Sequence, residues 1–209
     1  MKVSNQILAR TIVAATLSAA GLIISLHIIE SRYDPAWRMV SEYSNGDYGF
    51  LMRLAFFLTG VAILSMGTML RRITGSKLTK AASVAFFVSF VGLMLAMLFN
   101  QDPVNTKHMT FHGNMHGLAT ILGIPGFSVG ALLAGLWLKR QGSGVMASVI
   151  GYSTLATFLA MMIYLFVGIS KDTGFVSGTY AGICNRVVWV AMIATLLYFA
   201  NAFLRSAKR

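Results

Sequence analysis

Six long apolar runs account for most of the chain, and short polar or charged segments separate them. The runs cover residues 7–29, 49–70, 81–99, 109–138, 145–169 and 180–204. A helix needs about 20 mostly apolar residues to cross a bilayer. The pattern therefore predicts an all-α polytopic membrane protein, a bundle of six transmembrane helices. Because the connections are short, we expect residues 1–209 to form one transmembrane domain without a separate soluble part.

The composition agrees with a lipid environment. Hydrophobic residues make up 56% of the 209 residues and charged residues only 11%, and the mean hydropathy is +0.72. Soluble domains usually contain about 25% charged residues. The single cysteine, Cys184, lies in the last apolar run, which excludes an intrachain disulfide and a cysteine-based metal site.

Charged residues are divided unequally between the two sides of the predicted bundle. The side with both termini carries eleven cations and no acid, whereas the other side holds all six acids and six cations. Because basic segments tend to remain in the cytoplasm, both termini are predicted to be cytoplasmic in a multi-pass protein of a bacterial-type inner (plasma) membrane. The net charge of +11 is then explained by topology and by contact with anionic membrane lipids, without nucleic-acid binding. The oligomeric state is left open.

The stretch NQDPVNTKHMTFHGNMHG, residues 100–117, contains the densest group of candidate site residues. On a helix, His112 and His116 share one face because they are four residues apart. Gly113 and Gly117 thin the same helix enough for close approach of a neighbour or ligand. Asp102 precedes this helix and is expected to cap it.

Other polar residues extend this group to separate parts of the chain. A short amphipathic helix around residues 36–43 is expected along the membrane surface. Arg53, one turn inside the second run, is expected either to snorkel or to find an acid, with Glu42 or Asp47 as the candidate partner. Pro125 predicts a kink in the fourth run. The topology places one set of polar side chains in the outer half of the bundle: His27, Glu42, Arg53, Asp102, His112, His116, Asn185 and Arg186. Because polar groups are costly in hydrocarbon, this set predicts a cavity that opens to the extracytoplasmic side.

Several short motifs resemble a known family. They are the triplet Ser41-Glu42-Tyr43, the segment YGFLMRLAFFLTG, the pair FNQDP and HGNMHGLA, and NRVVW in the last run. Together these motifs resemble the six-helix integral membrane family called domain of unknown function 998 (DUF998). The resemblance covers nearly the whole chain. It implies six membrane spans and no established activity.

Three classes of function are compatible with these residues, and the first is a zinc-dependent membrane hydrolase. His112, His116 and His27 would hold zinc in an open three-ligand site, and the metal would lower the pKa of its bound water. Asp102 or Glu42 would accept a proton, and Ser41 belongs to the same candidate catalytic set. A lipid or another amphiphile would be the substrate, held through Arg53, Arg186 and Asn185.

The second class is a b-type haem protein, with His27 facing His112 or His116 as axial ligands and the arginines neutralising the propionates. In the third class the pocket binds or transports a lipid or a small anion without chemistry, or the charged groups only lock helices together. The sequence favours the hydrolase and leaves open whether the chain is an enzyme.

Overall fold

The computed structural model describes residues 4–73, 75–103, 106, 108–142, 145–170 and 177–206. The described part of the chain folds into six long α-helices and one short 3-10 helix, with no strand. In chain order they are α1 (Asn5–Ile29), η1 (Val40–Asn45), α2 (Gly49–Arg71), α3 (Lys77–Leu98), α4 (Phe111–Arg140), α5 (Val145–Ser170) and α6 (Ala181–Ser206). All six long helices are apolar and long enough to cross a membrane. The predicted all-α fold with six spans is therefore confirmed.

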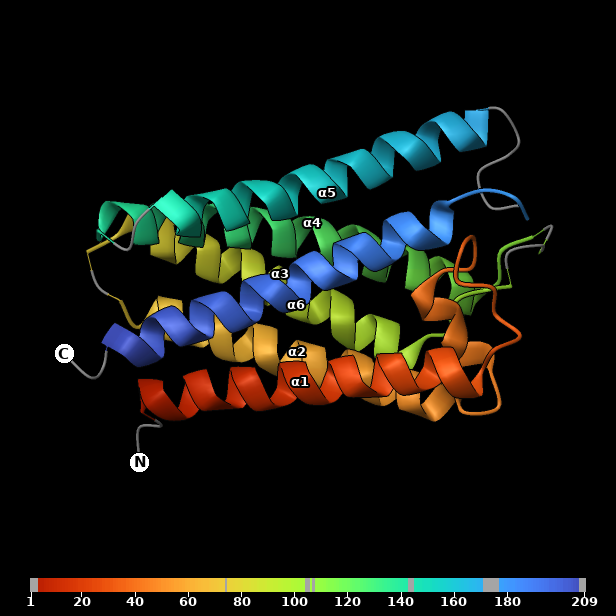
Figure 1. Cartoon of the computed structure of the whole chain (residues 1–209), viewed down its shortest axis with the longest axis horizontal. Helices are drawn as coiled ribbons and strands as arrows, with labels where there is room; N and C mark the ends of the chain where they lie inside the picture. Colours follow the sequence, from red (N-terminus) through yellow and green to blue (C-terminus); the bar gives the residue numbers. More distant parts are fainter. Residues whose placement is uncertain are drawn as a thin grey trace.

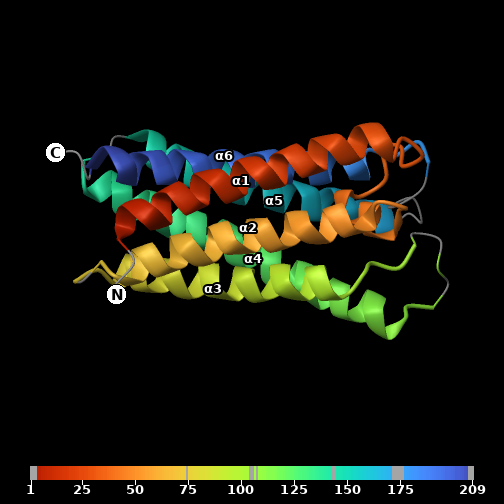
Figure 2. The same ribbon diagram turned by 90° about the horizontal axis from the view of Figure 1, so that it is seen from below.

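The six long helices form a closed ring. Each helix packs on the next one in the chain, and α6 packs on α1. All six run along the same long direction, so the start of α1 and the end of α6 lie at one end of the bundle (Figures 1 and 2). We call this end the terminal end, and the end that carries η1 the loop end. Because successive helices run in opposite directions, α2, α4 and α6 all begin at the loop end (Figures 1 and 2).

Side-chain caps define where several helices begin. Ser4 precedes α1 and accepts a hydrogen bond from the amide of Ile7, and Ser76 caps α3 in the same way through Thr79. Thr110 caps α4 by accepting from the amide of Gly113. These hydroxyls satisfy amides of the first helical turn that have no partner inside the helix.

Glycines set how closely the helices approach one another. A Cβ added to Gly92 of α3 would lie 2.4 Å from the amide nitrogen of Gly123 in α4. One added to Gly135 of α4 would lie 2.4 Å from the carbonyl oxygen of Ala147 in α5. Backbones meet at these points, as small residues allow in membrane helices. The α4–α5 contact is thus tightest near the turn that joins the two helices.

From that turn, α4 and α5 diverge toward the loop end, as both views show (Figures 1 and 2). Helix α4 continues through Pro125 as one helix. Close to this proline, Ser89 of α3 donates a hydrogen bond of 2.7 Å to the carbonyl oxygen of Gly123 in α4.

The segment between α1 and α2 differs from the amphipathic surface helix that the sequence predicts. Its helical part, η1, begins at Val40, and Val40, Glu42, Tyr43 and Ser44 are buried. Its position is fixed by α1, because buried Glu30 accepts a hydrogen bond of 2.8 Å from the amide of Tyr48. The prediction was wrong because the alternation of polar and apolar residues reflected packing against the helix ends and not against lipid.

Candidate functional site

A cavity of about 480 Å³ lies in the loop half of the bundle. Its walls come from η1, α2, α3, α4, α5 and α6 and from the connection between α3 and α4. The apolar part is formed by side chains that include Phe56, Leu93, Ala96, Ile124, Met161, Met162, Leu165, Val188, Trp189 and Met192. The polar part is formed by Ser41, Gln101, Asp102, Thr106, His116, Thr120 and Asn185. Four of the predicted site residues, Ser41, Asp102, His116 and Asn185, are thus brought to one cavity.

Asp102 and Ser41 are both engaged in hydrogen bonds at the edge of this cavity. The two carboxylate oxygens of Asp102 accept from the amide and the hydroxyl of Thr110, each at 2.7 Å. Asp102 therefore stabilises the start of α4, as the sequence predicts. The Ser41 hydroxyl donates to the side-chain carbonyl of Gln101. Together these contacts join η1 to the connection between α3 and α4.

His116 is the buried histidine of the cavity, with a relative exposure of 5%. Its Nδ1 lies 2.8 Å from the carbonyl oxygen of Phe99. Since a carbonyl only accepts, Nδ1 carries the proton, and Nε2 is left as an acceptor in the neutral ring. No described residue forms a hydrogen bond with Nε2.

Asn185 faces the cavity from the first turns of α6. Its side-chain oxygen accepts a hydrogen bond of 3.1 Å from the amide of Val40. This bond fixes the orientation of the amide group, so the NH₂ remains as a donor. The ring of Phe56 contacts both His116 and Trp189, and Trp189 is one helical turn beyond Asn185. His116 and Asn185 therefore both line the cavity, near Phe56 and Trp189.

Arg186 and His27 belong to a separate network outside the cavity lining. Arg186 donates from Nε to His27 Nε2 at 2.7 Å, and from its terminal nitrogens to the carbonyl oxygens of Arg38 and Gly182 and to the Tyr43 hydroxyl, at 2.7, 3.0 and 3.2 Å. His27 Nδ1 lies 2.7 Å from the carbonyl oxygen of Ile23. Both ring nitrogens of His27 are therefore occupied. The network joins α6 to α1 and to the segment that precedes α2.

Glu42 is fully buried, joins this network through Arg38, and is not among the residues that line the cavity. It accepts a hydrogen bond of 2.8 Å from the amide of Met39 and forms an ion pair of 2.7 Å with Arg38. Burial raises the pKa of the Glu42 carboxyl above its usual value, although the Met39 amide and Arg38 act in the opposite direction. Arg53 is exposed on α2, and Glu42 and Asp47 pair with Arg38 and Arg32 instead. The acidic partner predicted for Arg53 was therefore wrong.

The raised pKa of Glu42 predicts a pH-dependent stability. Its contribution is fully present below the ordinary pKa of a carboxyl and is lost as the pH rises through the raised value. The unfolding free energy of the natural chain should therefore fall as the pH rises above the ordinary carboxyl pKa of about 4.3, and Glu42→Gln should reduce this fall. Unfolding is measured in mixed micelles. The control is Asp47→Asn, which changes an exposed carboxyl. An unaltered pH profile in Glu42→Gln would contradict this prediction.

The described side chains do not fit the three-histidine zinc site. His112 is exposed at the start of α4, in contact with the rings of Phe99 and Phe111, whereas His27 has both ring nitrogens occupied. Among the described residues, no three His, Cys, Asp or Glu side chains are grouped so that they could hold a metal ion. A pair of axial haem ligands that includes His27 meets the same obstacle. Zinc and haem remain predictions that this arrangement does not favour.

The comparison with known families agrees with the fold. The sequence profile of the family described as "Protein of unknown function (DUF998)" matches residues 12–202. The chain belongs to the DUF998 family. The resemblance based on the short motifs is thereby confirmed, and this DUF998 protein is an integral membrane protein. No curated protein and no solved structure matches the chain.

Some cavity residues of this DUF998 protein were not identified from the sequence. Gln101 is adjacent to Asp102 in the FNQDP motif, so the prediction of Asp102 as a site residue could have indicated Gln101 as well. The contributions of Phe56, Trp189 and Met161 look like ordinary apolar positions of membrane helices. Nothing in the sequence distinguishes them from lipid-facing residues, because the distinction depends on how α5 is tilted.

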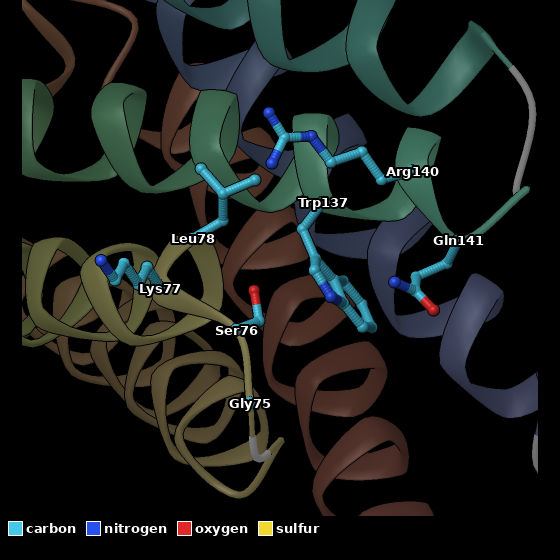
Figure 3. Close-up of a pocket in the computed structure, with 7 residues that line it drawn as sticks. All are labelled: Gly75, Ser76, Lys77, Leu78, Trp137, Arg140 and Gln141. Carbon is cyan, nitrogen blue, oxygen red and sulfur yellow. The ribbon is translucent and has the colours of Figure 1, made fainter.

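A second cavity, of about 470 Å³, lies at the terminal end between the start of α3 and the end of α4. Figure 3 shows Trp137 extending from α4 beside Gly75 and Ser76, while the charged ends of Lys77 and Arg140 are separated from each other. These two cations extend the basic surface of the terminal end. They do not converge on one point inside the cavity.

Proposed function

We propose that this DUF998 protein binds an amphiphile in the cavity of the loop half. The observation that supports this function best is a cavity with long apolar walls and a small group of polar side chains at one part of its lining. Ligand sites commonly have this composition, with a few polar groups that fix orientation. A membrane-embedded cavity of this kind suits a molecule with an alkyl chain and a compact polar head.

The volume sets an approximate size for the ligand. At about 30 Å³ per non-hydrogen atom, the share of one water molecule in the liquid, a cavity of about 480 Å³ holds roughly 16 such atoms. That number corresponds to one alkyl chain with a small head group. A complete two-chain lipid is too large unless most of it stays outside.

Access from the bilayer is supported by the position of α5. Met162 both lines the cavity and is 44% exposed on the outside of α5. The cavity wall is therefore continuous with the lipid-facing surface between α4 and α5. A chain dissolved in the bilayer can enter sideways at this point, where the two helices diverge.

A zinc-dependent hydrolase is the second candidate function and remains a prediction. Ser41, Asp102 and His116 do line one cavity, which is the observation in its favour. Against it, both Asp102 oxygens accept hydrogen bonds from Thr110, and Ser41 is bonded to Gln101 rather than to His116. Binding of an amphiphile requires none of these groups to be rearranged.

The experiment that tests binding uses Gly117, which lines the cavity. A Cβ added there meets no described atom within 4 Å, so Gly117→Leu would place a larger side chain in open space. Native mass spectrometry of protein purified in mild detergent should detect a retained amphiphile in the natural chain. Retention should fall about tenfold in Gly117→Leu, because the leucine occupies part of the cavity.

The matched control is Gly21→Leu in α1. Gly21 is exposed away from the cavity, and a Cβ added there also meets no described atom within 4 Å. This variant should retain the amphiphile like the natural chain. Equal retention in Gly117→Leu, or no retained amphiphile in the natural chain, would contradict the proposal.

A further inference from the structure

We infer that the amphiphile bound in the cavity carries an uncharged head group with a hydroxyl. This inference rests on the proposed function and adds the chemical class of the ligand. It depends on which charges face the cavity, on the hydrogen bonds that those charges already accept, and on the hydrogen-bonding groups that remain free.

The described lining contains no lysine or arginine. Arg186 is bonded to His27, Tyr43 and two backbone carbonyls, and Arg53 is exposed on α2. Lys107 lies outside the described residues. Anionic head groups such as phosphate are usually held by cationic side chains or by clustered backbone amides. The described lining therefore gives a phosphate no positive partner.

Asp102 is the one acidic residue among the described lining residues, and both of its carboxylate oxygens already accept hydrogen bonds. Both of these bonds come from Thr110. It also lies against the first turn of α4, where a Cβ added to Gly113 would be 2.0 Å from its Oδ2. Helix starts stabilise negative charge. Asp102 therefore supports the cap residue Thr110 at the positive end of α4, and it attracts an ammonium head group less than a carboxylate without these contacts would.

The free hydrogen-bonding groups complement a hydroxyl. His116 Nε2 is an acceptor without a partner among the described residues, and the residue is 5% exposed. The Asn185 NH₂ is a donor, because the side-chain oxygen is bonded to the amide of Val40. A hydroxyl is the one small uncharged head that suits either group, because it can donate to His116 Nε2 or accept from the Asn185 NH₂. An acceptor that a bound ligand covers without offering a donor costs free energy, so the cavity should discriminate against heads that cannot donate.

The test compares ligands that share a brominated tetradecyl chain and differ only in the head group. The heads are an alcohol, its methyl ether, a phosphate monoester and a trimethylammonium. Bromine quenches tryptophan fluorescence on contact, and Trp189 lines the cavity. Trp37→Phe and Trp137→Phe leave Trp189 as the only tryptophan. Dissociation constants are measured in bilayer nanodiscs of uncharged lipid.

The alcohol should bind about five- to tenfold more tightly than the methyl ether, as expected for one neutral hydrogen bond, and more tightly than the phosphate or the ammonium. In Gly117→Leu, made in the same background, quenching by the alcohol should fall to the level of a lipid-exposed tryptophan. Binding that is equal for all heads, or tightest for the phosphate or the ammonium, would overturn the inference and leave the proposed function intact. Absence of saturable quenching by every ligand would overturn both.

Discussion

Arg186→Met should lower the free energy of unfolding by about 2–3 kcal/mol, the range expected for hydrogen bonds made by a charged group. Arg186 makes four hydrogen bonds to acceptors on α1, on α6 itself and on the segment before α2. Methionine has similar length but leaves His27 Nε2 and the carbonyl oxygen of Arg38 without this donor. Unsatisfied acceptors at a half-buried position are costly. Titration with sodium dodecyl sulfate in mixed micelles would measure the change.

Arg53→Met is the matched control for this substitution. Arg53 also lies at the loop end, but it is exposed on α2. Its replacement should change the unfolding free energy by less than about 0.5 kcal/mol. If the two substitutions destabilise the protein equally, the network around Arg186 is not what holds α6 against α1.

Gly92→Ala should lower the unfolding free energy by about 2–3 kcal/mol. The added methyl group would lie 2.4 Å from the Gly123 amide nitrogen and 2.7 Å from the Ala119 carbonyl oxygen. These are backbone atoms, so α3 and α4 must move apart. Gly92 and Gly123 also line the cavity. The same variant should therefore retain less amphiphile in native mass spectrometry.

Gly21→Ala in α1 provides the control for this second substitution. A Cβ added at Gly21 meets no described atom within 4 Å, and alanine favours a helix over glycine by up to about 1 kcal/mol. Stability should stay equal or rise slightly. A tolerated Gly92→Ala would show that the contact between α3 and α4 can relax at little cost.

The fold could be predicted from the sequence because hydropathy alone identifies membrane-spanning helices. Each predicted run overlaps one helix, and the largest shift is at α3, which begins at Lys77 rather than at residue 81. The sequence could not show that residues 40–45 are buried. Their environment depends on the ends of other helices, as the bonds from the Val40 amide to Asn185 and from Asn100 to the Ser44 carbonyl illustrate.

The candidate site was predicted in part, for an equally physical reason. The high cost of polar groups in a membrane correctly indicates that polar side chains gather. It does not indicate which of them belong to the same group. Arg186 and Asn185 are adjacent in sequence and lie on different faces of α6. One joins the network with His27, and the other faces the cavity beside Phe56 and Trp189. The sequence grouped both into one pocket because only the packing of α6 separates them.

The polar residues form two groups, the network around Arg186 and the polar lining of the cavity, and each group has a distinct role. The network of Arg186, His27, Tyr43, Arg38 and Glu42 fastens the loop end of the ring. Among the described residues, His116 Nε2 and the Asn185 NH₂ of the cavity group have no hydrogen-bond partner. Substitutions in the network should therefore reduce stability first, whereas substitutions that fill the cavity should reduce binding first.

The most direct test of the cavity as a ligand site is a density map of the protein in bilayer nanodiscs, determined by electron cryomicroscopy. We expect an elongated feature between α4, α5 and α6 that contacts Trp189 and Met161, with one end next to His116 and Asn185. A cavity that is closed by a shift of α5 onto α4, or that contains only separate water-sized features, would contradict the binding of an amphiphile.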